Sequence, residues 1–295
     1  MTIFIYLPHV SSLISQVSSL MSHVSCLMSN ILTFAPMNLH FKKYGSGRPL
    51  IILHGIFGIS DNWVTFGKRI ADMGFEVYLL DQRNHGRSPH HYAFTYYALV
   101  DDLVEFIEQQ EIEMPIILGH SMGGKVAMRY TLENPDDVSA LIVVDTSMRT
   151  YISHTYHRTL IDAMKSVDFS KASSRQDVEQ HMKTFIDSPR IVQFLMKNLF
   201  WKEKDILGWR INLEAIDLNM DSMYDGVFYS TVFDQPTLFI RGGRSDYIIE
   251  EDIPVMKKNF NNMDLHTIKE GTHWVHADAP KEFFEHVSQF LKDQI

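Results

Sequence analysis

The sequence predicts an α/β fold in which a mostly parallel sheet is flanked by helices and interrupted by a helical insertion. Three observations lead to this prediction. Short apolar runs recur along the chain, helix-length segments that begin at capping residues separate them, and this alternation stops between about residues 148 and 229. The alternating part is expected to form βαβ units, whereas the interrupted stretch is expected to form a cap over them.

The strands are predicted from short runs of apolar residues. Residues 39–43 alternate between apolar and polar side chains, which is typical of an edge strand with one exposed face. The later runs are apolar almost throughout, as strands covered by helices on both faces require, and they predict a parallel sheet. These runs lie at 49–53, 76–80, 115–118, 140–144 and 237–240, with a last strand near 264–268.

Helices are predicted where a capping residue precedes a helix-length segment. Ser60 and Thr95 can accept hydrogen bonds from the first backbone N–H groups of helices over 61–73 and 96–110. Each predicted helix follows a predicted strand, so the two types of element alternate. Further helices are expected over 124–133, around 253–260 and over 280–293, the last with Pro280 in its first turn.

The insertion at 148–229 divides a core that consists of 37–147 and 230–295. Its helical signals follow one another without an intervening strand. Its many methionine and aromatic side chains can pack into a core of the cap itself, but together they also suggest an apolar substrate chamber. Ser174 and Ser188 can cap the first two predicted cap helices, over 174–186 and 189–199, and a third is predicted over 209–220.

Residues 1–36 are dominated by three nearly identical seven-residue units over 9–29. The spacing of valine and leucine would suit a short coiled coil or an amphipathic helix on a membrane surface, but the serines and the lack of charged pairs weaken both readings. We interpret the repeats as translated tandem DNA, with Met37 as the natural start and the extension as an artefact or a disordered segment. A secretory signal is not indicated, because no Lys or Arg precedes Lys42.

Composition limits the classes of function. The 295-residue chain carries a net charge of −9 and no basic run, which argues against a nucleic-acid partner. Its one cysteine, Cys26, excludes an intramolecular disulfide and is typical of a reducing cytoplasm. The 15 histidines show no metal-binding spacing, and no apolar run is long enough to cross a bilayer. No metal site is predicted, and no oligomeric state is indicated.

The sequence GHSMG at 119–123 is the strongest indication of chemistry. It lies between the apolar run 115–118 and a helix-like segment from Gly124, which is the setting of a nucleophile elbow. In such a strand-to-helix turn the small residues avoid steric clashes, and the serine hydroxyl is exposed at the N-terminus of the helix. Ser121 is therefore the candidate nucleophile.

A candidate acid and a candidate base follow Ser121 in the chain order that a serine hydrolase of this architecture requires. His273, in a loop after the last predicted strand, is the candidate base. Asp246 follows the strand after the cap and is the preferred acid, whereas Asp145, directly after the last strand before the cap, is the alternate. His276 is expected to support the loop that carries His273.

The loop HGIFG at 54–58 is expected to complete the site. Its backbone N–H at Ile56, or alternatively at Phe57, can join the N–H of Met122 as the two donors of an oxyanion hole. The turn DQRNHGRS at 81–88 is expected to be structural and is assigned no catalytic role. The side chains expected to contact the substrate are those of His54, Phe57 and His120.

Four strings carry a resemblance to a known family: HGIFG followed by DNW over 54–63, DQRNHGRS over 81–88, GHSMGGKVAM over 119–128 and GTHWVHAD over 271–278. From about Met37 to the C-terminus, the chain resembles the YbfF-type esterases and their abhydrolase-domain relatives in the α/β-hydrolase superfamily. The resemblance implies an α/β-hydrolase fold with the helical cap inserted after the sixth strand, and no metal or organic cofactor. It also implies that Ser121 is the nucleophile and His273 the base. Some relatives lack an acid at the position of Asp246 and use the one at the position of Asp145.

The expected activity is hydrolysis of short to medium acyl esters through an acyl-enzyme, with acyl-CoA thioesters as a further candidate substrate. The expected partner is thus a small-molecule acyl ester or thioester. An acyltransferase, a C–C hydrolase or a perhydrolase stays open within the serine enzymes. The alternative from another class is a ligand-binding protein that keeps the fold without the chemistry, although every position of the triad is filled in this sequence.

Overall fold

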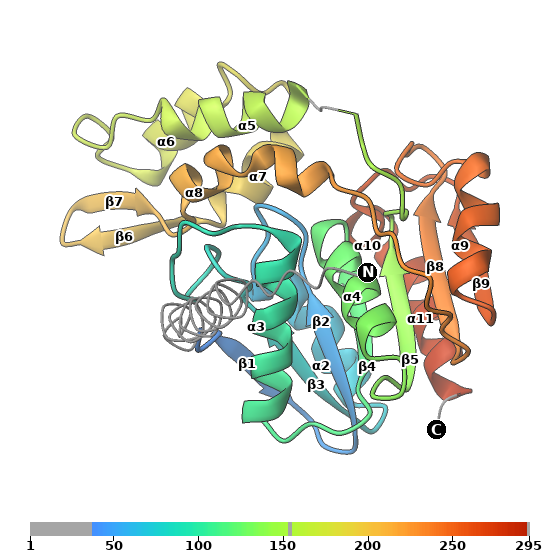
Figure 1. The fold of residues 1–295 in the computed structure, drawn as a ribbon. Helices are drawn as coiled ribbons and strands as arrows, with labels where there is room; N and C mark the ends of the chain where they lie inside the picture. The colour runs from blue at the N-terminus through green and yellow to red at the C-terminus, as the bar shows by residue number, and fades with distance from the viewer. Residues whose placement is uncertain (1–36, 153–154, 294–295) are drawn as a thin grey trace, which may run out of the picture. The chain divides into compact units, whose positions relative to one another are not determined.

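The computed structural model contains a seven-stranded sheet within residues 37–152 and 155–293, which are the residues that the structure describes. The predicted repeat extension at 1–36 lies outside these residues. The strands are β1 (Phe41–Tyr44), β2 (Arg48–Leu53), β3 (Phe75–Leu80), β4 (Ile116–His120), β5 (Ala140–Val144), β8 (Thr237–Gly242) and β9 (Met263–Ile268). Their order across the sheet is β1-β3-β2-β4-β5-β8-β9 (Figure 1).

The sheet is parallel except at one edge, where β1 runs antiparallel to β3. All residues of β4 and β5 are buried, as are the last four residues of β2. Strands with apolar side chains on both faces need helices on both faces of the sheet. The connections between parallel strands contain these helices. The prediction of a mostly parallel sheet flanked by helices is confirmed.

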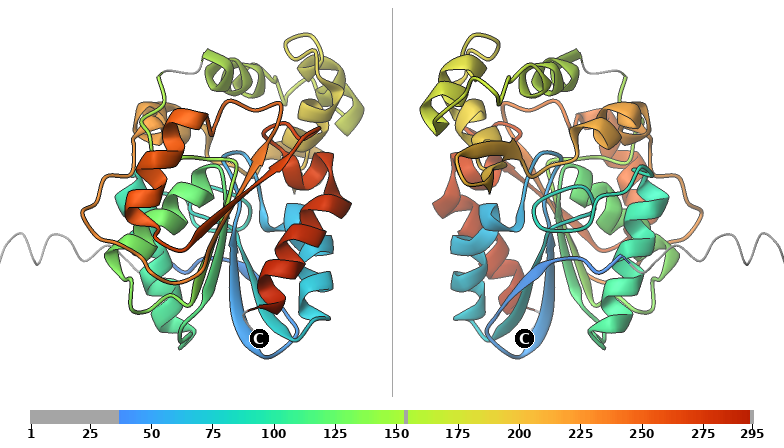
Figure 2. Two further views of the ribbon diagram at one scale, coloured as in Figure 1. Left: turned by 90° about the vertical axis from the view of Figure 1, so that its right-hand side faces the viewer. Right: turned by 90° about the vertical axis from the view of Figure 1, so that its left-hand side faces the viewer.

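Helices cover both faces of the sheet (Figure 2). One face carries α2 (Val64–Ala71) and α11 (Pro280–Lys292), and the other carries α3 (Tyr96–Gln109), α4 (Met122–Glu133) and α9 (Ile253–Asn259). Thr95 caps α3 as predicted, because its side chain accepts from the N–H of Ala98 at 3.3 Å. Ser60 instead begins the 3-10 helix η1 (Ser60–Trp63), and α2 starts only at Val64.

An apolar cluster of the core joins the sheet to α2 and α11. It includes Leu50, Val77 and Ile142 from the strands and Phe283 and Val287 from α11, each at most 1% exposed. Full burial of such a side chain stabilises the fold by ~1.5–3 kcal/mol relative to exposure. This packing fixes the strands, so their carboxyl ends form a rigid edge on which loops can place side chains accurately.

The segment between β5 and β8 lies over the carboxyl edge of the sheet (Figure 1). Ser174 and Ser188 cap its helices as predicted, accepting from the N–H groups of Asp177 and Ile191. The segment and the core belong to one compact unit that begins at Asn38. Its elements are α5 (Thr155–Lys165), α6 (Arg175–Met182), α7 (Pro189–Met196), β6 (Leu199–Glu203), β7 (Ile206–Trp209), α8 (Leu213–Leu218) and the 3-10 helix η2 (Met220–Tyr224).

Two details of the predicted cap are corrected. It is not wholly helical, because β6 and β7 form an antiparallel hairpin where continuous helical signals were expected. The hairpin turn uses Asp205 at φ 61° and contains no glycine or asparagine, so the sequence carried no usual turn signal. The cap also follows β5, which is the fifth described strand and not the sixth.

Candidate active site

The turn at Ser121 joins β4 to α4 through a strained backbone. Ser121 has φ 54° and ψ −118°, a conformation that residues with a Cβ rarely adopt. A Cβ on Gly119 would lie 2.2 Å from the carbonyl oxygen of Gly123, and a Cβ on Gly123 would lie 2.4 Å from that of Leu53. Only glycine fits at either position, so the sequence GHSMG places Ser121 in a sharp strand-to-helix turn.

Ser121, His273 and Asp145 form a continuous chain of hydrogen bonds. The Ser121 hydroxyl donates to Nε2 of His273 at 2.8 Å, and Nδ1 of His273 donates to Oδ2 of Asp145 at 2.8 Å. The three residues follow β4, β9 and β5, so the carboxyl ends of separate strands bring them together. A hydroxyl in this arrangement can lose its proton to the imidazole, while the carboxylate balances the charge that the imidazole gains.

Asp145 is fully buried, and donors reach both of its carboxylate oxygens. Oδ1 accepts from the backbone N–H of Gly242 at 2.8 Å, and Oδ2 accepts from the hydroxyl of Ser245 as well as from His273. Both Gly242 and Ser245 belong to the end of β8 and the loop after it. These hydrogen bonds compensate for the removal of the carboxylate from water.

Asp246, the preferred acid of the sequence analysis, lies elsewhere. It is exposed on the loop after β8, and its backbone carbonyl accepts from the guanidinium of Arg149 at 2.5 Å. The geometry therefore reverses the order of the two candidates and favours Asp145. The physical reason is the length of the loops: Asp145 directly follows β5, whereas the residues between Gly242 and Asp246 carry the latter outwards.

The ring of Tyr247 stacks on the imidazole of His273, a contact that the sequence analysis missed. The ring centroids are 3.7 Å apart and the planes differ by 19°. The backbone carbonyl of Tyr247 accepts from the hydroxyl of Tyr151 at 2.9 Å, and burial raises the pKa of the Tyr247 phenol. The stack restricts rotation of the imidazole. Its only signal in the sequence is an aromatic residue next to an expected site residue.

Two cavities reach Ser121. The larger one, which we call the serine cavity, has a volume of about 110 Å³, and a smaller one of about 20 Å³ lies beside α4. Met220 and Met223 of the cap line the smaller cavity, so part of the predicted apolar chamber does border Ser121. The serine cavity is lined by Gly55, Ile56, Phe57, His120, Ser121, Tyr156, His157, Leu160, Phe194, Tyr247, His273 and Trp274.

The two candidate donors of the oxyanion hole, Ile56 and Met122, both line the smaller cavity together with Ser121. Met122 is the first residue of α4, so its N–H has no acceptor within the helix. The N–H of Phe57, the alternate donor, is already engaged, because it donates to Nε2 of His85 at 3.2 Å. The geometry therefore favours Ile56 over Phe57.

The peptide groups of Phe57 are fixed from both the core and the cap. Its N–H donates to His85 in the turn at 81–88, and its carbonyl accepts from the amide of Asn198 at 2.8 Å. Phe57 has φ 63°, and these two hydrogen bonds help to hold this unfavourable conformation. The turn at 81–88, expected to be only structural, thus positions the loop of the candidate oxyanion hole.

His54 and His120 are buried and bonded within the protein. Nδ1 of His54 donates to the carbonyl of Gly55 at 2.8 Å, Nε2 accepts from the N–H of Gln82 at 3.0 Å, and the residue lines neither cavity. Its expected substrate contact is corrected to a structural role. Nε2 of His120 donates to the carbonyl of His273 at 2.8 Å, and burial lowers the pKa of His120 to about 3, so this ring is neutral. His120 and Phe57 do line the serine cavity, and their contact with substrate stays a prediction.

Lys125, in the helix that follows Ser121, ties the two ends of the cap to the core. Its ammonium group donates to the carbonyls of Arg149, at 2.9 Å, and of Asp225. These acceptors lie at the beginning and the end of the segment that forms the cap. Burial lowers the pKa of Lys125 to about 7. The sequence analysis assigned no role to this residue.

The described residues were also compared with what a metal-ion site and a membrane-spanning helix require. Within 37–152 and 155–293, no group of three His, Cys, Asp or Glu side chains is placed to hold a metal ion. No helix in the same ranges combines the length and the apolar character that crossing a bilayer requires.

Known proteins share both the sequence pattern and the fold. A family model described as alpha/beta hydrolase fold matches residues 48–181. The sn-1-specific diacylglycerol lipase ABHD11 of Danio rerio is 35% identical over 268 residues, which cover 88% of this chain and 84% of that protein. Esterase YbfF of Escherichia coli is 30% identical over 247 residues, which cover 83% of this chain and 93% of that protein. A solved structure described as a marine microorganism esterase is 41% identical, with a TM-score of 0.84. The match covers 86% of this chain and 99% of the esterase chain.

The fold and these similarities define a hydrolase of the α/β-hydrolase superfamily. Within it, the chain belongs to the abhydrolase-domain esterases. The resemblance found in the sequence is thereby confirmed.

Proposed function

We propose that the protein hydrolyses carboxylic esters with short to medium acyl chains through an acyl-enzyme on Ser121. The observation that supports this most is the hydrogen-bond chain from Ser121 through His273 to Asp145, with both links at 2.8 Å. An ordinary strand-to-helix turn needs neither a base nor a buried carboxylate beside its serine. The arrangement is that of an activated nucleophile.

The first step forms the acyl-enzyme. His273 accepts the hydroxyl proton of Ser121 as the serine oxygen attacks the ester carbonyl. The N–H groups of Met122 and Ile56 stabilise the negative charge that develops on the carbonyl oxygen. When the intermediate collapses, His273 donates its proton to the leaving alkoxide, and the acyl group remains on Ser121 as an ester.

The second step releases the acid. A water molecule takes the place of the alcohol, and His273 accepts its proton as the oxygen attacks the acyl carbon. The second tetrahedral intermediate collapses, the proton returns to Ser121, and the free carboxylic acid leaves. In both steps Asp145 stabilises the imidazolium form of His273, and Tyr247 keeps the ring in its plane.

The lining of the serine cavity supports an acyl chain of limited length. Leu160, Phe194 and Trp274 offer apolar surface within a volume of about 110 Å³. The relative from Danio rerio is named as a lipase acting on diacylglycerol, which makes glycerol esters a reasonable substrate class for this chain. Acyl-CoA thioesters stay a further candidate. A cytoplasmic location stays a prediction from the single cysteine.

Replacement of Ser121 tests the mechanism. Ser121→Ala should lower kcat for p-nitrophenyl butyrate by at least ~10⁴-fold, because no other group can carry the acyl chain. The wild-type protein should react with a fluorophosphonate probe at Ser121, and the variant should not. Product analysis in the presence of an added alcohol distinguishes hydrolysis from acyl transfer, because an acyltransferase would form a new ester in place of the acid.

Ser139→Ala is the matched control. Ser139 is a buried serine just before β5, at the end of that strand opposite to Asp145, and its loss should leave turnover unchanged. If the Ser121 variant folds normally but still hydrolyses the ester at a rate close to wild type, the proposed mechanism is wrong.

A further inference from the structure

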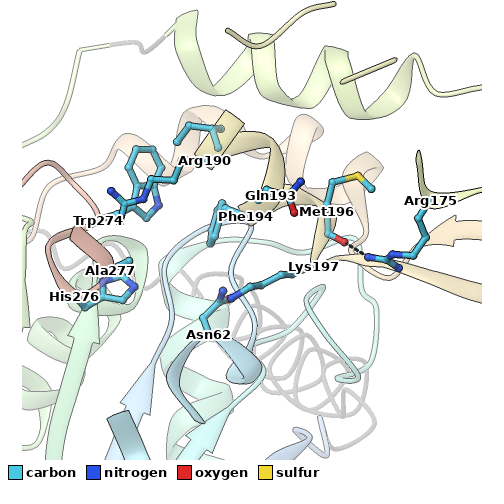
Figure 3. A pocket seen from close by; sticks show the side chains of 11 residues that line it. Asn62, Arg175, Arg190, Gln193, Phe194, Met196, Lys197, Trp274, His276 and Ala277 are labelled. Atoms are coloured by element: carbon cyan, nitrogen blue, oxygen red, sulfur yellow. Dashed lines mark hydrogen bonds between the residues drawn. The ribbon is translucent and has the colours of Figure 1, made fainter. Parts of the chain in front are cut away.

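A cavity of about 420 Å³, which we call the basic cavity, is shown in Figure 3, and it shares two lining residues with the serine cavity. The cap contributes residues of α6 and α7 to it, and the core contributes η1 and the segment after His273. Phe194 and Trp274 line both cavities, and their ring centroids are 6.1 Å apart. A molecule whose ester lies at Ser121 could therefore extend past these two rings into the basic cavity.

The lining of the basic cavity is positively charged. It includes Arg175, Arg190 and Lys197 and no carboxylate. Arg190 forms an ion pair with Asp278 of α10 (Val275–Asp278), which compensates for one of these charges. For Lys197, no ion pair is recorded among the described residues. The cavity therefore keeps a net positive charge, although the chain as a whole carries −9.

Hydrogen bonds hold one of these charges, that of Arg175, in a defined position. The guanidinium of Arg175 donates to the carbonyl oxygens of Met196 and Leu199 at 2.9 and 2.8 Å, which fixes it below the end of α7 (Figure 3). Asn62 accepts from the N–H of Ile59 through Oδ1 at 2.7 Å, so its amide NH₂ remains as a donor at the cavity. Cations and neutral donors together are what a phosphate group requires.

We infer that the basic cavity binds a phosphate group carried by the substrate, while the ester of the same molecule reacts at Ser121. This inference rests on the proposed esterase function and narrows it to phosphorylated acyl esters. Lys197 would act as a point charge and Arg190 as a planar donor to the phosphate oxygens. The site adds binding only, and the chemistry at Ser121 is unchanged.

Two esters that differ only in the phosphate group test the inference. Monooctanoylglycerol and its 3-phosphate have the same acyl chain, so release of octanoate from each reports the effect of the charge. The wild-type kcat/KM should be at least ~10-fold higher for the phosphorylated ester, mainly through a lower KM. Raising the salt concentration from about 0.05 to about 0.5 M should reduce this preference, because partly exposed charges are screened.

Charge-neutral variants assign the preference to the cavity. Lys197→Gln and Arg190→Gln should each lower the ratio of kcat/KM for the phosphorylated ester to kcat/KM for the neutral ester by ~5–10-fold. Lys197→Gln should leave the neutral ester unchanged, whereas Arg190→Gln can slow both esters equally, because it leaves the buried carboxylate of Asp278 without its ion pair. The matched control is Lys202→Gln, on the exposed part of β6, which lies outside the lining and should change neither substrate. A wild-type preference that survives in both Lys197→Gln and Arg190→Gln would overturn the inference.

Inorganic phosphate separates the remaining outcomes. It should raise the Tm of the wild-type protein and not that of Lys197→Gln, because only the former keeps the full charge of the site. A phosphate-dependent Tm without any preference between the esters would mean that the cavity binds free phosphate, and the assignment to the substrate would be wrong. If both esters are hydrolysed equally well and phosphate does not change the Tm, the inference is wrong but the esterase function stands. Failure to hydrolyse either ester refutes the function instead, and with it the assignment of the phosphate to a substrate.

Discussion

The loops after β5 and β8 leave neighbouring parallel strands at the same edge of the sheet, and each contains an aspartate. Asp145 directly follows β5, is fully buried and accepts hydrogen bonds from His273, from Gly242 at the end of β8 and from Ser245 in the loop after it. Asp246 lies further from its strand and is exposed. Two residues of the same type in similar positions along the chain thus have entirely different surroundings.

The difference shows that proximity to a strand end does not by itself define a catalytic acid. The end of β8 and the loop after it support Asp145, because Gly242 and Ser245 donate to its carboxylate. The same loop supplies Tyr247, which stacks on His273. A carboxylate in the interior needs such donors to balance its burial, and they surround Asp145 and not Asp246.

The largest effect is expected for Asp145→Asn. An amide cannot stabilise the imidazolium form of His273 and can favour the wrong tautomer, so kcat for p-nitrophenyl butyrate should fall by ~10³–10⁴-fold. KM should change little, because the side chain does not line the serine cavity. Steady-state kinetics give both values, and circular dichroism checks that the variant folds.

The result for Asp145→Asn is to be compared with that for Asp246→Asn, the corresponding change in the loop after β8. If Asp145→Asn kept more than about a tenth of the activity while Asp246→Asn lost most of it, Asp246 would have to be restored as the acid, in spite of its exposure.

A smaller effect is expected for Ser245→Ala. This change removes one hydrogen bond to a charged, buried oxygen of Asp145, and such bonds contribute ~1.5–3 kcal/mol, so kcat should fall by ~10–150-fold. Ser245→Thr keeps the hydroxyl and should restore most of the activity. If the threonine variant were as slow as the alanine variant, the loss would reflect packing and not the hydrogen bond.

Local patterns predicted the sheet, most helices and the turn at Ser121. The buried strands appear as unbroken apolar runs, and Thr95, Ser174 and Ser188 cap helices as their residue type indicates. The glycines around Ser121 are needed by backbone contacts within a few residues and with β2. The order of Ser121 and His273 in the chain correctly indicated that they meet, because the topology of the sheet fixes where the end of each strand lies.

Contacts between distant residues could not be predicted. Asn198 reaches the carbonyl of Phe57 across 141 residues, and nothing in the sequence around either residue indicates this. The choice between Asp145 and Asp246 also depended on how far one loop extends and on donors from the other. The hairpin of the cap was missed because its turn at Asp205 has no glycine or asparagine.

The smallest effect is expected for Asp246→Asn. This variant tests whether the aspartate side chain of the loop after β8 contributes to the reaction at all. The contact recorded for Asp246 with Arg149 uses its backbone carbonyl, which the substitution keeps. An exposed side chain of this kind contributes ~0.5 kcal/mol or less to stability, so kcat should stay within about threefold of wild type and Tm should hardly change. Steady-state kinetics of both aspartate variants in the same buffer give the ratio of their kcat values, and thermal denaturation gives their Tm values. If kcat of both variants were equally far below wild type, both aspartate side chains would contribute to the reaction. If kcat of Asp246→Asn exceeded that of Asp145→Asn by ~10³-fold, the loop after β8 would keep its role in holding Asp145 and His273 in place.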